Sequence, residues 1–74
     1  MSAEYEIRIA GPVGEDGRRA LRDLDMRVVD ENGGVTVVHG RLDQPGLHGL
    51  LDRLRALGLP LEEVRRLPRG SRPS

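Results

Sequence analysis

Few residues of this 74-residue chain could serve as nucleophiles or bases, because the sequence contains no cysteine and only two histidines. A hydroxyl nucleophile needs a base within hydrogen-bond reach and a third group that orients that base. No spacing in the sequence brings such groups together. The possible nucleophiles are Ser2, Tyr5, Thr36, Ser71 and Ser74, and the possible bases are His39 and His48. We therefore expect a protein without catalytic activity.

A metal site is the second chemistry to consider. His48 and Asp52 stand four residues apart, which places both on one face of a helix. A third ligand would have to come from His39 or Asp43. Two histidines without any cysteine are a weak metal signal, and a surface His48 paired with Asp52 is the better explanation of the spacing. We expect no metal and no cofactor.

The segment 11–19, GPVGEDGRR, contains three glycines and superficially resembles a phosphate-binding loop. It matches neither G-x-x-x-x-G-K-[ST] nor G-x-G-x-x-G. Glu15 and Asp16 also stand where the phosphate would bind at the start of the following helix. The segment therefore predicts a turn into a helix whose dipole favours acidic residues in its first turn.

The charge balance disfavours nucleic acid as a partner. The chain has 12 basic residues, all arginine, and 12 acidic residues, so its formal net charge is zero. Nucleic-acid-binding domains usually carry a basic excess. Tyr5 is the only aromatic residue available for base stacking.

No apolar run is long enough to span a membrane, and the amino-terminal residues include acids where a signal peptide has bases. We expect a cytoplasmic protein.

The remaining sequence predicts the elements that position these side chains. Residues 4–10 alternate between apolar and charged side chains, which is typical of a strand with one buried face formed by Tyr5, Ile7 and Ile9. A helix is expected over Glu15–Asp25. Strands over Met26–Glu31 and Val35–Leu42 flank the turn Asn32-Gly33-Gly34, a strong hairpin signal. Two registers remain open, with Val28 opposite Val37 or Val29 opposite Val38.

A second helix begins after Asp43, which can cap it, and its leucines follow helical spacing. Leu50, Leu51 and Leu54 lie in the middle of this stripe and are expected to pack against Ile7 and Ile9. Gly58 suits the left-handed position that ends a helix, with Leu59 able to fold back. A charged edge strand is expected over Leu61–Leu67.

The order strand, helix, strand, strand, helix, strand predicts an α+β fold, the ferredoxin-like βαββαβ two-layer sandwich with antiparallel sheet order 4-1-3-2. We expect residues 1–67 to form this single domain and residues 68–74 to be a flexible tail containing arginine. The segment LDQPGLHGLLDRLRALGLPLEEVRRL resembles a group of small uncharacterised proteins from high-GC bacteria that share D-Q-x-x-L-H-G-x-L and R-x-L-G-L-x-L stretches. This resemblance implies a fold and no established activity.

These observations favour a small non-catalytic interaction or regulatory module that associates through a strand edge or a sheet face. The expected partner is a second copy of the chain or another protein. The residues expected to contribute are Met26, Val28, Val29, His48, Arg65 and Arg66. Two alternatives remain. One is a small-molecule sensor resembling ACT domains, with its site at the loop 11–14. The other is a weak nucleic-acid accessory that acts through the arginine-rich tail.

Overall fold

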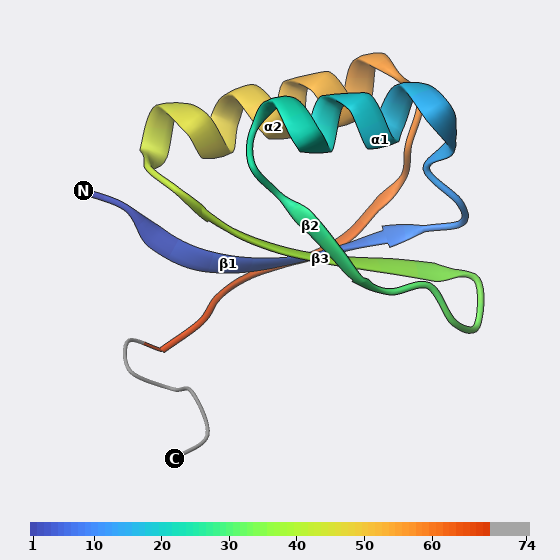
Figure 1. Ribbon diagram of the computed structural model, residues 1–74, viewed down its shortest axis with the longest axis horizontal. Coiled ribbons are helices and arrows are strands. Elements are labelled where there is room, and N and C mark those ends of the chain that lie inside the picture. Colours follow the sequence, from blue (N-terminus) through green and yellow to red (C-terminus); the bar gives the residue numbers. More distant parts are fainter. Residues whose placement is uncertain (69–74) are drawn as a thin grey trace.

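Six elements follow one another in the computed structural model, which describes residues 1–68. They are β1 (Ala3–Ala10), α1 (Gly14–Asp23), β2 (Arg27–Asp30), β3 (Val35–Leu42), α2 (Gln44–Ala56) and β4 (Leu61–Arg66). The strands form one antiparallel sheet in the order β2-β3-β1-β4, which is the predicted order read from the other edge. Both helices cover the same face of this sheet (Figure 1). The predicted element order, sheet order and α+β class are confirmed.

The core lies between the helices and the two inner strands, β1 and β3. Ile7 and Ile9 are fully buried, as their alternation with charged residues predicts. Leu50 and Leu54 of α2 are buried too, whereas Leu51 is only half-buried, so the expected burial of Leu51 is wrong. Successive helix residues are rotated by about 100°. Leu51 therefore lies at the margin of the face that Leu50 and Leu54 present to the sheet.

Both ends of α2 follow their sequence signals. The Asp43 carboxylate accepts a hydrogen bond from the Gly46 N–H at 2.8 Å, which caps the first turn. Gly58 adopts the left-handed conformation with φ +73°. The chain then turns back, and the Leu59 N–H donates to the Leu54 carbonyl at 3.0 Å. The predicted cap and stop of this helix are confirmed.

Helix α1 ends two residues earlier than predicted. Asp25 has φ +58°, and the Met26 N–H donates to the Leu21 carbonyl at 2.9 Å, so the chain already reverses there.

Close packing explains why a glycine, which weakens a helix, stands at position 17 of α1. A Cβ at this position would stand 2.7 Å from the Cβ of Val13, so only glycine lets the loop after β1 approach the helix so closely.

The hairpin follows neither predicted register along its whole length. Val28 is opposite Val38 and Asp30 is opposite Val37, so Val29 is an extra residue in β2. Such a bulge bends an edge strand and shifts its pairing. Met26 lies outside β2, and its side chain packs in the core, where it leaves no room for a Cβ on Gly40.

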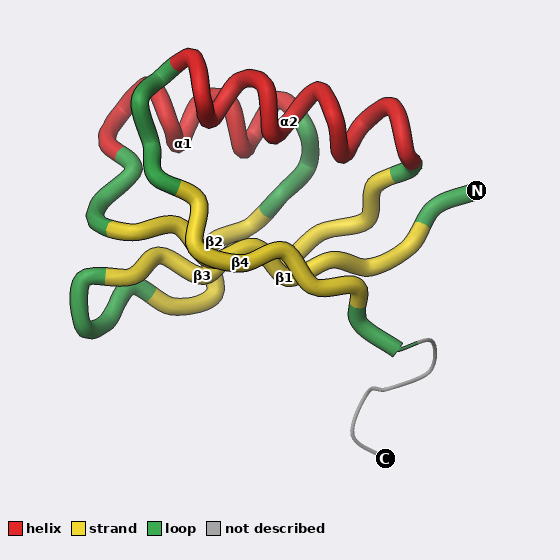
Figure 2. The backbone as a smooth tube through the Cα atoms, turned by 180° about the vertical axis from the view of Figure 1, so that it is seen from behind, coloured by secondary structure: helices red, strands yellow, loops and turns green. Residues whose placement is uncertain are grey.

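No element of residues 1–68 covers the face of the sheet opposite the helices (Figures 1 and 2).

β4 ends at Arg66, one residue before the predicted boundary, and of the predicted tail only Pro68 lies within the described residues. No helix in this part of the chain is both long and apolar enough to cross a membrane.

Candidate functional site

The uncovered face, called the open face below, contains a glutamate that is nearly as buried as the core. Glu6 on the inner strand β1 exposes only 8% of its surface. It stands directly opposite His39 on β3 and Arg65 on β4. The alternation of β1 predicts that Glu6 lies on this face, but its burial depends on side chains that arrive from two other strands.

Three cationic or hydrogen-donating side chains converge on the Glu6 carboxylate. His39 Nε2 lies 2.9 Å from Oε1, and Arg65 Nη2 and Arg8 Nε lie 3.1 and 3.2 Å from Oε2. The hydrogen bond with His39 is the main cause that lowers the pKa of Glu6 from its ordinary value of 4.5; burial opposes it, and the two arginines lower the pKa further. Glu6 is therefore held as an anion in a fixed position.

Two ion pairs with longer distances flank the contacts of Glu6. Arg27 Nη2 of β2 lies 3.7 Å from Glu4 Oε2, and Arg8 Nε lies 3.6 Å from Glu63 Oε1. These pairs are largely exposed and contribute little stability. Together with the contacts of Glu6, these ion pairs connect side chains from all four strands. The open face therefore presents positive and negative groups in fixed positions.

Two of the predicted nucleophiles, Tyr5 and Thr36, do not share the open face with His39. Side chains along a strand alternate between the two faces of the sheet. Thr36 is three residues from His39 in β3, and Tyr5 is next to Glu6 in β1, so both hydroxyl groups lie on the face opposite His39 and Glu6, which the helices cover. The Thr36 hydroxyl is buried and donates to the Gly11 carbonyl at 2.9 Å. The described residues also contain no group of three or more metal-ligating side chains.

The outer edge of β2 is the second feature of interest. Because β2 ends the sheet, one side of its backbone has no neighbouring strand among the described residues. A cleft of about 240 Å³ lies beside it, between β2 and α1. Its lining residues are Arg18, Leu21, Arg22, Met26, Arg27 and Val28. Val29, the extra residue of the bulge, exposes 47% of its surface. This edge combines free backbone groups, aliphatic surface and arginines.

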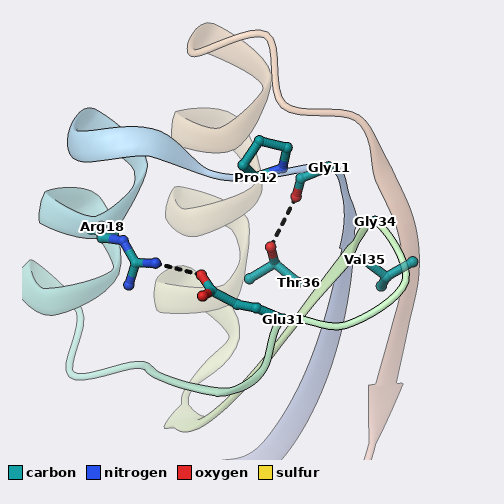
Figure 3. A pocket seen from close by; sticks show the side chains of 7 residues that line it. All are labelled: Gly11, Pro12, Arg18, Glu31, Gly34, Val35 and Thr36. Atoms are coloured by element: carbon teal, nitrogen blue, oxygen red, sulfur yellow. Dashed lines mark hydrogen bonds and ion pairs between the residues drawn. The ribbon is translucent and has the colours of Figure 1, made fainter.

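A second hollow of about 220 Å³ lies at the loop after β1 (Figure 3). Gly11 and Pro12 form one side, the turn residue Gly34 and the first two residues of β3 form another, and an ion pair between Arg18 and Glu31 borders it. Both charged side chains are about half-exposed. The hollow adjoins the loop that the alternative of a small-molecule sensor would use.

The remaining predicted site residues are spread over the molecule. Val28 and Val29 lie at the β2 edge, while the Met26 side chain is buried and can offer a partner only its backbone. Arg65 reaches the open face, and Arg66 is exposed on the opposite edge strand, β4. His48 is exposed on α2. Arg69 and Arg72, the arginines of the predicted tail, lie outside the described residues.

Comparison with known proteins finds one family. A family model described as a domain of unknown function (DUF8691) matches residues 4–65. This match agrees with the expected resemblance to small uncharacterised proteins. No curated protein and no solved structure matches the chain.

Proposed function

The chain belongs to the DUF8691 family, whose function is unknown, and we propose that it is a non-catalytic protein-interaction module that pairs a partner strand with the free edge of β2. The observation that carries this proposal is the free edge of β2, which exposes Val29 and lies beside the arginine-bordered cleft. Strand addition to a sheet edge uses backbone hydrogen bonds for affinity and neighbouring pockets for specificity.

The other edge of the sheet fits this role less well. The strand β4 reads LEEVRR, and its Glu62, Glu63, Arg65 and Arg66 are exposed. Charged side chains along an edge strand oppose the approach of another strand. Arg65 is moreover held by Glu6 at 3.1 Å. β2 has only Arg27 and Asp30 as charged residues, at its two ends, with valines between them.

Site-specific photo-crosslinking tests this proposal. A photoreactive amino acid at Val29 of the full chain should give a covalent adduct in extracts of cells that express the protein, and mass spectrometry should identify the attached peptide. The same amino acid at Arg55, exposed on α2 away from the edge, is the control. An adduct at Val29 without one at Arg55 supports the β2 edge as the interaction surface. Equal labelling at both positions, or none at Val29, contradicts it.

A small-molecule sensor is the second candidate, and the hollow at Gly11 favours it. The matching ligand class is a small zwitterion that replaces the ion pair of Arg18 and Glu31, with its carboxylate on Arg18 and its ammonium group on Glu31. A ligand at a hundred times its Kd stabilises a protein by about 2.7 kcal/mol, which a thermal-shift panel of amino acids detects. Arg18→Ala should abolish the shift, while Arg19→Ala, on the same helix but outside the hollow, should retain it. A panel without any shift rules this candidate out.

A further inference from the structure

We infer that the strand that pairs with β2 is the β2 strand of a second copy of this chain, antiparallel to it and related by a two-fold axis between Val28 and Val29. This inference rests on the proposed strand-edge function and names its partner. The evidence is the charge order of β2 together with the effect of its bulge.

The sequence of β2 is complementary to itself when it runs antiparallel. Residues 27–30 read Arg-Val-Val-Asp. Pairing of all four residues sets Arg27 opposite the partner's Asp30 and Val28 opposite the partner's Val29. The two-fold axis repeats both contacts, which gives two ion pairs at the ends and two aliphatic pairs between them. Opposite charges directly across a strand pair are stabilising, whereas like charges are destabilising.

These ion pairs require Arg27 and Asp30 to lie on one face of the sheet. In a regular strand, residues three apart point to opposite faces. Here Arg27 is opposite His39 and Asp30 is opposite Val37, and these two β3 residues are two apart and share a face. The ion pair between Arg27 and Glu4 places that face on the open side. The bulge at Val29 thus puts the acid and the base of β2 on the same face.

The valines support the same arrangement. Val28 packs partly against the core, and Val29 is 47% exposed. In the paired edge, the partner's Val29 covers Val28 at the mouth of the cleft beside α1. A contact of four residues per strand is smaller than a standard protein interface, so the dimer is weak and reversible. Because the two-fold contact uses the β2 edge of both copies, association stops at two copies.

Charge reversal tests the pairing by complementation between two variants. Arg27→Asp leaves two acids on β2, and Asp30→Arg leaves two arginines, so each variant alone faces itself with like charges. Each should weaken the dimer by about tenfold or more in sedimentation velocity over a micromolar to millimolar series. An equimolar mixture of the two variants restores both ion pairs and should form a heterodimer about as stable as the wild-type dimer. Arg66→Asp on β4 makes the same charge change at the other edge and should not alter the dimer.

Circular dichroism first establishes that each variant is folded, since Arg27 and Asp30 are exposed. Restoration in the mixture supports the inference, and so does restoration in the double variant. Two single variants that dimerise as well as wild type, or a mixture that stays monomeric, overturn it. A wild-type chain that is monomeric at about millimolar concentration overturns self-pairing as well. That last outcome leaves the strand-edge function standing if Val29 still crosslinks to a different protein.

Discussion

Replacing Glu6 by glutamine removes the one negative charge that His39, Arg8 and Arg65 share on the open face. The side chain keeps its size and one oxygen acceptor, so the change acts mainly on charge. The contact to His39 is the least exposed of the three, with the His39 side chain at 26%, whereas Arg8 and Arg65 are at 42% and 56%. The loss of stability should therefore come chiefly from the His39 contact.

The magnitude follows from these exposures. A hydrogen bond to a charged group that is largely buried contributes about 1.5 kcal/mol, and each exposed arginine contact contributes about 0.3 kcal/mol. Glu6→Gln should thus lower the free energy of unfolding by about 2 kcal/mol at pH 7. For a domain of this size that corresponds to a decrease in Tm of about 10 °C. Urea denaturation and thermal melting measure both quantities.

The pH dependence of the same variant provides a second readout. The pKa of Glu6 in the folded protein lies below 4.5, first because of the hydrogen bond with His39. Its contribution to stability is complete above that value and is lost as the pH falls through the folded pKa, because the unfolded chain takes up the proton first. The difference between wild type and Glu6→Gln should therefore shrink as the pH falls below 4.5.

Glu63→Gln is the matched control, because Glu63 lies on the same face with one exposed contact to Arg8 at 3.6 Å. Its effect should stay within about 0.5 kcal/mol. Equal stabilities of the Glu6 and Glu63 variants at pH 7, with parallel acid profiles, would refute the reasoning.

Three further predictions concern the core, the hairpin and the tail. Leu50→Ala should lower the free energy of unfolding by about 2–5 kcal/mol because Leu50 is fully buried, while Leu57→Ala, at an exposed position, should change it by less than about 1 kcal/mol in urea denaturation. Gly40→Val should destabilise the fold by about 2 kcal/mol or more because its Cβ would collide with Met26, and the double variant with Met26→Ala should recover part of that loss. Deletion of residues 68–74 should leave the far-UV spectrum and Tm nearly unchanged, and a loss of several degrees would show that the tail docks on the domain.

Local patterns were sufficient to predict most of the elements. The sequence of β1 predicts which of its side chains are buried, because apolar and charged residues alternate along it and only the apolar ones suit the core. α2 is predicted from its Asp43 cap to its Gly58 stop, because both signals act within a few residues of the helix end. Because chain connections follow a few general rules, this order of elements is compatible with few sheet topologies. The predicted ferredoxin-like topology is the one observed.

What could not be predicted depends on contacts between distant segments. The burial of Glu6 requires His39 and Arg65 to stand opposite it, and their registers follow from the packing of the whole sheet. The bulge at Val29 has no sequence signal of its own, because no glycine or proline marks it. The position of Leu51 at the margin of α2 depends on how the helix is rotated over the sheet.

The most direct test of the proposed interaction edge is amide hydrogen exchange of the wild-type chain, measured at increasing protein concentration. Pairing at β2 predicts that exchange in residues 27–30 slows as the concentration rises towards about a millimolar, while exchange in β4, residues 61–66, stays constant. Exchange in residues 27–30 that is independent of concentration, with slowing in residues 61–66 instead, would contradict the assignment of β2 as the interacting strand.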